Sequence, residues 1–343
     1  MAPFSSLRAT LTQAYPPAPA FTEANAPPGS QNGRVFIVTG GNAGIGLELC
    51  KILYASGATV YMASRSQVGL GGQSRSGHQT ITEASKAKNT SGKLKFLYLD
   101  LNDLLVVKAA AESFAQQEDK LDVLWNNAGT GANMVTIGQR TAQDFEPMIG
   151  MHCIATLLFT KLLLPQLWAA ASSGESGKTR VIWTSSALAE WGSPPNGFDF
   201  DLLDKGTNNR TDNYGTSKAG TWILSREFAR RYAKDGIVSV CLNPGFLKTA
   251  SFNGTPAAIM FVLNKFLLSD AIYGAYTELY AGLSSDITLE NSGSYIIPWG
   301  RIRPNEATPR QDLIKAGDSK AEGGLDYGNR FWAWCEEKWN SHI

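Results

Sequence analysis

The sequence predicts an α/β protein with one parallel sheet between two layers of helices. From about residue 34 to about residue 300, short apolar runs rich in β-branched residues alternate with segments whose apolar residues recur at helical spacing. The short runs are apolar on both faces, which is typical of strands covered by helices on both sides. No internal repeat or long linker interrupts the series. We therefore expect a doubly wound parallel sheet of about seven strands in a single domain.

The predicted elements follow one another along the chain. The strand candidates are residues 34–40, 58–64, 94–100, 121–129, 179–186 and 237–245. The helix candidates are residues 44–57, 102–117, 141–171 and 213–234. The first helix is expected to end at Gly57, because glycine readily takes the left-handed conformation that terminates helices.

Several segments lie outside this alternation. Residues 1–33 carry clustered Pro and Ala and predict an irregular N-terminal arm. Inserts near 66–92, 187–212 and 250–270 each follow the carboxyl end of a predicted strand, the edge where open α/β sheets bind ligands. The last insert is apolar and is expected to form a lid. Residues 301–343 form a C-terminal extension, in which FWAWCEEKW (331–339) predicts an amphipathic helix packed on the body.

The composition excludes several classes of partner. The chain has 31 basic and 30 acidic side chains, so its net charge of +1 lacks the excess that nucleic acid or anionic lipid attracts. It shows neither an apolar leader nor a run of roughly 18 apolar residues. We therefore expect no nucleic-acid partner, no membrane span and a cytoplasmic location.

The cysteines and histidines do not predict a metal site. Cys50, Cys153, Cys241 and Cys335 are far apart and never form a CxxC pair, so we expect buried free thiols. The histidines, His78, His152 and His342, show no metal-ligand spacing.

A glycine-rich loop joins the first predicted strand to the first helix. In TGGNAGIG (39–46), Gly40 permits a tight turn, Gly44 lets the backbone approach a phosphate, and Gly46 lets helix and strand pack closely. The following helix N-terminus offers free N–H groups and a positive dipole end to an anion. The spacing is GxxxGxG rather than the generic GxGxxG.

Further motifs follow in order. NNAG (126–129), Ser186 and NPGFLKT (243–249) lie at the carboxyl ends of the fourth, fifth and sixth strand candidates, and YGTSK contains Tyr214 and Lys218. With TGxxxGIG, these motifs resemble those of the classical short-chain dehydrogenase/reductase family, in particular its fungal retinol-dehydrogenase-like branch, over roughly residues 34 to 300. The resemblance implies a Rossmann-like fold and a nicotinamide cofactor. It places cofactor contacts at Gly40, Asn42, Gly44, Ile45, Gly46, Ser64, Arg65, Asp100, Leu101, Asn127, Ala128, Gly129, Tyr214, Lys218, Pro244, Gly245 and Thr249.

The end of the second predicted strand favours NADPH over NADH. Ser64 occupies the position where NAD-preferring proteins usually carry a carboxylate, and Arg65 follows it. A guanidinium can bind the 2′-phosphate of NADPH, whereas a carboxylate would repel it. The alternative is that Arg65 is a solvated loop residue. Asp100 is expected to contact the adenine edge, or else to cap the helix that starts near Asn102.

Tyr214, Lys218 and Ser186 are the expected catalytic residues. Hydride transfer between nicotinamide and a carbonyl builds charge on oxygen, so a proton donor is needed. Tyr214 would donate it, and Lys218, one helical turn away, would lower the pKa of the phenol. By resemblance, Lys218 also touches the nicotinamide ribose. Ser186 would hydrogen-bond the substrate oxygen.

His152 is the main departure from the family pattern, which places asparagine there to hold a water between the lysine and solvent. Three interpretations remain open. The histidine is a tolerated replacement, it acts in an altered proton relay because its free pKa lies near ~6.5, or the redox chemistry is lost or diverted.

These features predict an NADPH-dependent oxidoreductase, a ketoreductase or alcohol dehydrogenase acting on a hydrophobic small molecule. By resemblance, secondary metabolism is a plausible setting. The alternatives are a non-redox isomerase or dehydratase on the same scaffold, and a protein that binds NADPH without catalysis. Family members often pair through two long helices, here 141–171 and 213–234, so a homodimer is also implied unless an insert covers that face.

Overall fold

The computed structural model describes residues 3–66, 92–249 and 256–343. Nearly all of the predicted insert at 66–92 and the first part of the predicted lid, residues 250–255, lie outside the described residues.

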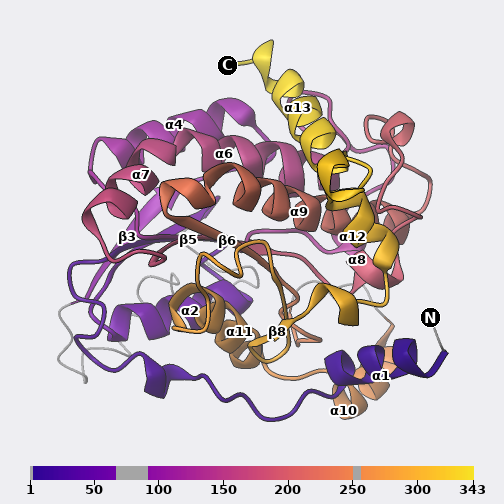
Figure 1. The fold of residues 1–343 in the computed structure, drawn as a ribbon, viewed down its shortest axis with the longest axis horizontal. Helices are drawn as coiled ribbons and strands as arrows, with labels where there is room; N and C mark the ends of the chain where they lie inside the picture. The colour runs from indigo at the N-terminus through magenta and orange to yellow at the C-terminus, as the bar shows by residue number, and fades with distance from the viewer. Residues whose placement is uncertain (1–2, 67–91, 250–255) are drawn as a thin grey trace.

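The fold is a single sheet with helices on both faces, as predicted (Figure 1). Its strand order is β3-β2-β1-β4-β5-β6-β7-β8. All neighbours pair in parallel except β7 and β8, so the described sheet has eight strands rather than about seven. The strands are β1 (Val35–Thr39), β2 (Thr59–Ser64), β3 (Lys93–Tyr98), β4 (Val123–Asn126), β5 (Thr179–Thr184), β6 (Ile237–Leu242), β7 (Tyr295–Ile297) and β8 (Arg301–Arg303).

The helices form two layers. One sheet face carries α4 (Leu104–Ala115), α6 (Thr156–Leu162), α7 (Leu164–Ser173) and α9 (Arg210–Tyr232), and the other carries α2 (Gly44–Ala55) and α11 (Ala271–Leu283) (Figure 1). The remaining helices are α1 (Pro3–Ala14), α5 (Pro147–Ile149), α8 (Leu188–Trp191), α10 (Ala257–Phe266), α12 (Gln311–Gly317) and α13 (Tyr327–Asn340). Short 3₁₀ turns lie at Glu23–Asn25, Ala132–Met134, Phe200–Leu202, Ala233–Asp235, Asn305–Ala307 and Lys320–Glu322.

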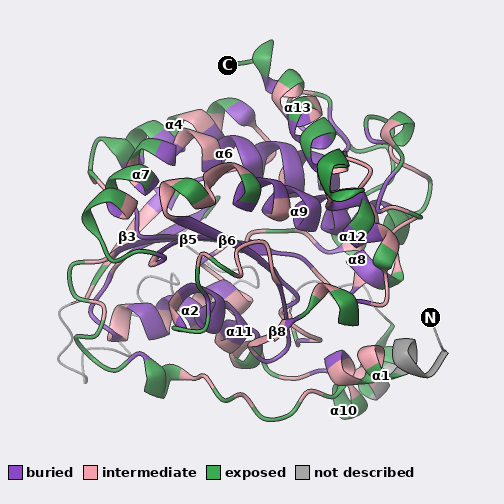
Figure 2. Cartoon of the chain, in the orientation of Figure 1, coloured by how far each residue is buried: buried purple, intermediate pink, exposed green. Residues whose placement is uncertain are grey.

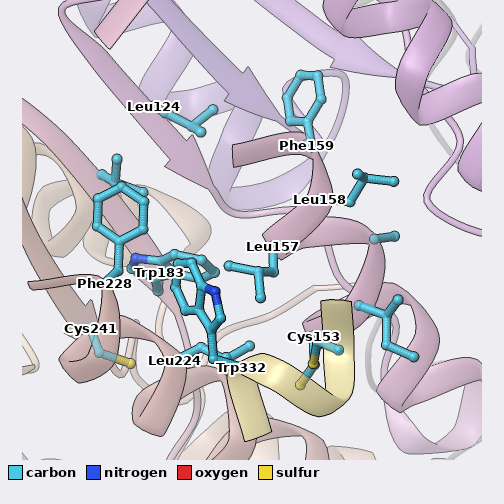
Figure 3. Close-up of a cluster of buried hydrophobic side chains, with 14 of the residues drawn as sticks. Leu124, Cys153, Leu157, Leu158, Phe159, Trp183, Leu224, Phe228, Cys241 and Trp332 are labelled. Atoms are coloured by element: carbon cyan, nitrogen blue, oxygen red, sulfur yellow. The ribbon is translucent and has the colours of Figure 1, made fainter. Parts of the chain in front are cut away.

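Each face of the sheet has its own buried apolar core (Figure 2). On the α9 side, Trp183 of β5 and Phe228 of α9 pack at 6.0 Å between ring centroids, and Trp332 of α13 joins the same cluster (Figure 3). On the α11 side, Trp125 of β4 packs edge-on against Phe36 of β1. Because every residue of β1, β4, β5, β6 and β7 is buried, the sheet is a rigid platform for its carboxyl edge.

The N-terminal arm is not irregular throughout, which corrects the expectation for residues 1–33. Residues Pro3–Ala14 form α1, a three-turn helix. Gln13 near its end is 1% exposed and accepts a hydrogen bond from Asn243 Nδ2 at 2.9 Å. Thr12 O accepts one from the Arg301 guanidinium at 2.6 Å. The helix is therefore held by tertiary contacts that local propensity does not reveal.

The single helix expected over 141–171 is also wrong. The segment begins at Pro147 with α5, continues as a π-helix over Gly150–Ala155, and then forms α6 and α7. The chain bends by 54° between Leu162 and Leu164. Pro165 lies in the first turn of α7, where its missing N–H and its ring interrupt a continuous helix. The π-helical turn contains His152.

The C-terminal extension returns to the body of the protein. In α13, Phe331, Trp332, Cys335 and Trp339 are at most 6% exposed, and the helix packs on α9, on the π-helical turn and on α6. No single helix among the described residues is long and apolar enough to cross a membrane.

Candidate active site

The predicted site residues gather at the carboxyl edge of the sheet. The loop between β1 and α2 carries the glycines, and Gly40 and Gly44 have φ of +68° and +52°, which only glycine adopts without strain. The N-cap of α2 is Ala43, whose side chain cannot cap the helix, so the first N–H groups of α2 are available to an external anion. Ile45 is half-buried in the first turn.

Gly46 lies where a side chain would not fit. A Cβ there would be 2.4 Å from Gly40 O and 2.7 Å from Asn127 Nδ2. Asn127 Nδ2 donates to Thr39 O at 2.7 Å, and Thr39 Oγ1 accepts from Ala128 N at 2.8 Å. These contacts hold β1, the glycine loop and the NNAG segment together. The role of Thr39 in this arrangement was not predicted from the sequence.

The end of β2 lies next to the glycine loop. Asn42 Nδ2 donates to Ser66 O at 3.0 Å, and Ser64, which is buried, donates from Oγ to the same carbonyl at 2.8 Å. Arg65 is exposed. This edge therefore offers a guanidinium and no carboxylate at residues 64–66.

Asp100 does not cap the helix as the alternative interpretation proposed. Its Oδ1 accepts from Asn102 N and Asn102 Nδ2, both at 3.0 Å. The helix α4 begins at Leu104, and Asp103 caps it by accepting from Leu105 N at 3.0 Å. Asp100 and Leu101 are both half-buried in the turn after β3.

Tyr214, Ser186 and Lys218 converge on one point. The Ser186 side chain lies close enough to the Tyr214 hydroxyl to act on its pKa, and the Lys218 ammonium lies 5.5 Å from the centroid of the Tyr214 ring. Lys218 Nζ donates to Thr184 O at 3.0 Å at the end of β5. Ser186 follows β5 by two residues, and Tyr214 and Lys218 lie one turn apart on α9.

Burial dominates the proton affinities of this group. It lowers the pKa of Lys218 to about 8. It raises the pKa of the Tyr214 hydroxyl, and the neighbouring Ser186 side chain opposes that rise. The direction for Tyr214 is opposite to the one expected from its spacing to Lys218, because desolvation of the phenolate outweighs the other effects.

His152 is held on both ring nitrogens. Its Nε2 accepts from Thr130 N at 3.0 Å, so its Nδ1 carries the proton and donates to Ser217 Oγ at 2.8 Å. Ser217 in turn donates to Tyr214 O at 2.8 Å. Burial, and then the charge of Lys218, lower the pKa of His152 well below its ordinary value. His152 is therefore a neutral link between the segment after β4 and the catalytic helix.

Gly129 brings that segment against the catalytic groups. A Cβ at Gly129 would be 3.1 Å from His152 Nε2 and 3.4 Å from Lys218 Nζ. The NNAG glycine therefore gives the backbone a close approach to both side chains.

The turn after β6 completes the edge. Gly245 has φ of +98°, and a Cβ there would lie 2.4 Å from the Trp299 ring. Asn243 Oδ1 accepts from Gly245 N at 3.0 Å, which holds the turn through Pro244. Thr249 lies near the glycine loop, with its Cγ2 3.8 Å from a Cβ built at Gly44.

A buried polar group beside this turn was missed by sequence reasoning. Glu190 of α8 and Arg303 of β8 form an ion pair in which both side chains are at most 5% exposed. Gln13 of α1 donates to Glu190 Oε2 at 3.4 Å and accepts from Asn243. No sequence spacing links residues 13, 190, 243 and 303, so only the fold could reveal the cluster.

Comparisons with known proteins identify the family of the chain. The family model for short chain dehydrogenases matches residues 34–197. The short-chain dehydrogenase/reductase iacJ of Pestalotiopsis fici is 44% identical, over 99% of this chain and 100% of its own. The relative bet4 of Neocamarosporium betae, with the same description, is 40% identical over 98% of this chain and 93% of its own.

The chain belongs to the short-chain dehydrogenase/reductase family. Among solved structures, an NADPH-bound carbonyl reductase from chicken fatty liver is 26% identical with a TM-score of 0.57, covering 79% of this chain and 99% of its own. The family assignment makes the protein an NAD(P)-dependent oxidoreductase. The side-chain-free cradle at Gly46 and the uncapped N-terminus of α2 fit the pyrophosphate of such a cofactor.

Proposed function

We propose that this short-chain dehydrogenase/reductase is an NADPH-dependent ketoreductase or alcohol dehydrogenase for a hydrophobic small molecule. The observation that carries the proposal is the convergence of Ser186 and the Tyr214 hydroxyl, with Lys218 one turn away, at the same sheet edge as the glycine loop. A protein that only bound the cofactor would not need these side chains together.

Each side chain has a chemical part in the proposal. Bound nicotinamide supplies or accepts the hydride. Tyr214 gives its hydroxyl proton to the developing oxyanion, and Ser186 orients that oxygen by a hydrogen bond. Lys218, fixed by Thr184 O, places a positive charge beside the phenol. His152 keeps the helix in register through Ser217 and does not take part in proton transfer, since both ring nitrogens are engaged.

The cofactor preference is proposed from residues 64–66. Ser64 carries no charge and the exposed Arg65 is available to a 2′-phosphate, while a carboxylate is absent from this segment. The NADPH-bound state of the chicken carbonyl reductase supports the proposal by analogy. In the same proposal, the other residues predicted to bind the cofactor contact NADPH along the carboxyl edge of the sheet.

The substrate class is proposed from the side chains next to the turn after β6. Trp191 of α8 stacks on Phe246, with 5.3 Å between ring centroids and 18° between planes. Trp299 lies over Gly245 and packs against Tyr273 at 5.3 Å. These flat apolar surfaces suit an aromatic or polycyclic ketone. A role in secondary metabolism, suggested by the resemblance to fungal members of the family, and a cytoplasmic location are part of the same proposal.

Turnover of hydrophobic ketones, followed by NADPH absorbance at matched NADPH and NADH concentrations, tests the proposal. Tyr214→Phe should reduce turnover about 100-fold or more while leaving NADPH affinity nearly unchanged, because only the proton donor is removed. Unchanged turnover in that variant would disprove redox catalysis by this site.

The variant Arg65→Ala should weaken the binding of NADPH and leave the binding of NADH unchanged. An isomerase or dehydratase would convert substrate without net consumption of NADPH.

A further inference from the structure

A buried carboxyl lies behind the catalytic lysine. Glu278 is the only charged residue in α11 and is 0% exposed. Its Oε1 accepts from Thr184 Oγ1 at 2.6 Å. Its Oε2 has no hydrogen-bond partner among the described residues. Burying such a group costs free energy unless a charge or a proton compensates for it, so its position calls for a physical reason.

Thr184 connects this carboxyl to Lys218. The side chain of Thr184 donates to Glu278, and the carbonyl of the same residue accepts from Lys218 Nζ at 3.0 Å. Lys218 reaches Thr184 from α9, whereas Glu278 reaches it from α11 on the opposite face of the sheet (Figure 1). One residue at the end of β5 therefore holds an acid on one side and a base on the other.

Lys218 is the charged group whose field acts on Glu278 among the described residues. Three side chains oppose the fall in the pKa of Lys218: the buried thiols of Cys153 and Cys241, and the carboxyl of Glu278. Glu278 is the only carboxyl among them. Around α11, β6 and β7 turn apolar side chains toward the shared core. Several polar or titratable groups outside α11 act on it or bond to it. Among the described residues they are Trp125 of β4, Cys50 and Glu48 of α2, Arg180 of β5, Glu23 beside Tyr276, and Asp286, which accepts from Tyr280 Oη.

Those other groups are already engaged. Arg180 donates to the carbonyls of Ala281, Ser284 and Ile287, at and beyond the C-terminal end of α11. Lys51 pairs with Glu48 at 2.7 Å, and Trp125 Nε1 donates to Glu278 O at 2.9 Å. Burial raises the pKa of the Cys50 thiol, which keeps it neutral. Lys218 is thus the group left to balance the carboxyl.

We propose that Glu278 is a positioning residue for the proton-transfer site. From the far face of the sheet its carboxyl ionises as the pH rises and then opposes the loss of the Lys218 proton, and through Thr184 it fixes the carbonyl that holds the ammonium. This inference rests on the proposed function for its catalytic consequence, although the coupling between the two side chains exists whether or not the protein turns over.

The proton affinities of the two groups agree with this geometry. Burial raises the pKa of Glu278 to about 8, and the hydrogen bond from Thr184 and the charge of Lys218 oppose the rise. Burial lowers the pKa of Lys218 to about 8, and Glu278 is among the groups that oppose that fall. The two groups therefore titrate in the same range around pH 8, where the charged form of each stabilises the charged form of the other and the two protonation equilibria are coupled.

The titration of Lys218 tests the inference directly. The full chain is labelled with ¹³Cε-lysine, and the Lys218 signal is assigned from its loss in Lys218→Arg and followed by NMR against pH. Glu278→Gln keeps the shape of the side chain but removes the charge, so the midpoint for Lys218 should fall by about half a pH unit or more. Glu48→Gln, which removes a carboxylate from α2 on the same sheet face, should leave the midpoint unchanged.

An unchanged Lys218 midpoint in Glu278→Gln would overturn the proposal. If that variant does not fold, Thr184→Val replaces it. Loss of the Thr184 hydroxyl removes a hydrogen bond that stabilises the ionised form of Glu278, so the titration midpoint of Lys218 should again fall. An unchanged midpoint would again overturn the proposal.

Turnover gives the second readout. In Glu278→Gln the alkaline limb of the pH–rate profile for ketone reduction should move to lower pH, because Lys218 loses its proton earlier. A general loss of stability would lower turnover at all pH values without moving the limb. If the wild-type protein reduces no ketone, the proposed function fails, while the NMR titration still decides the role of Glu278.

Discussion

At the scale of single residues, His152 shows how a departure from a family pattern can be read from its contacts. Its ring accepts from Thr130 N and donates to Ser217, which donates to Tyr214 O. Sequence reasoning left open a proton relay through this imidazole. The structure supports the interpretation of a tolerated replacement, because both nitrogens are occupied and burial keeps the ring neutral.

This neutrality predicts a pH-dependent stability. Below pH ~6.5 the unfolded chain binds a proton at His152 that the folded chain does not. The free energy of unfolding should therefore fall as pH drops from about 6.5, with a contribution of about 1.4 kcal/mol per pH unit from this residue. Urea denaturation at several pH values checks this.

His152→Asn removes the contribution, so its stability should fall less steeply between about pH 6.5 and pH 5 than that of the wild type. The matched control is His342→Asn, which changes an exposed histidine and should keep the wild-type slope. Equal slopes in wild type and His152→Asn would contradict a buried neutral ring.

At the scale of secondary-structure elements, α1 supports the active-site edge although it lies far from the catalytic residues in the sequence. Gln13 accepts from Asn243, which holds the Gly245 turn, and donates to Glu190, which pairs with Arg303. Gln13→Ala would leave the buried Asn243 amide without this acceptor, at a cost of about 1–3 kcal/mol.

We expect Gln13→Ala to lower turnover and raise the KM for ketone several-fold, because the Gly245 turn loses its support. Steady-state kinetics measure this effect. The control is Arg8→Ala, an exposed position on the same helix, which should match the wild type. Wild-type kinetics for Gln13→Ala would mean that α1 contributes nothing to the site.

Local sequence patterns were sufficient to predict the elements that are specified by nearby residues. Strands buried on both faces, the glycine loop and the NNAG and YGTSK segments all lie at the predicted residues, since periodicity and turn chemistry specify them. The break in 141–171 could also have been found, because Pro165 inside a predicted helix is a visible signal.

Other features depend on contacts distant in the sequence. The helix α1 docks against Asn243 and Arg301, and no local pattern indicates that partner. Glu278 stands alone in the otherwise uncharged segment 271–283, a signal that marks it as unusual but does not show that it lies behind Lys218.

At the scale of the whole molecule, the C-terminal extension covers the helix face that the resemblance would use for a dimer. The helix α13 packs on α9 and on the π-helical turn, and Trp332 lies with Trp183 and Phe228 in the same core cluster (Figure 3). A homodimer through α9 would require α13 to leave this face. We therefore expect the full chain to sediment as a monomer, or to pair through another surface.

Gly220 of α9 provides the sharpest test of this docking. A Cβ at Gly220 would be 3.0 Å from Phe331 Cε1 and 3.0 Å from Cys153 Sγ, so the glycine leaves just enough space for the Phe331 ring. Substituting a larger residue such as Gly220→Val should push α13 outward and destabilise the protein by about 1–3 kcal/mol. Thermal denaturation and sedimentation measure the two consequences, since a displaced α13 uncovers an apolar face that favours self-association.

The matched control is Gly323→Ala, in a turn where a Cβ would meet no atom within 4 Å. That glycine has φ of +80°, so its variant carries a backbone cost of about 1 kcal/mol without touching the α9 face. It should lower the melting temperature but leave the sedimentation coefficient unchanged, whereas Gly220→Val should change both. If Gly220→Val stays monomeric and as stable as the wild type, α13 does not shield α9 in solution.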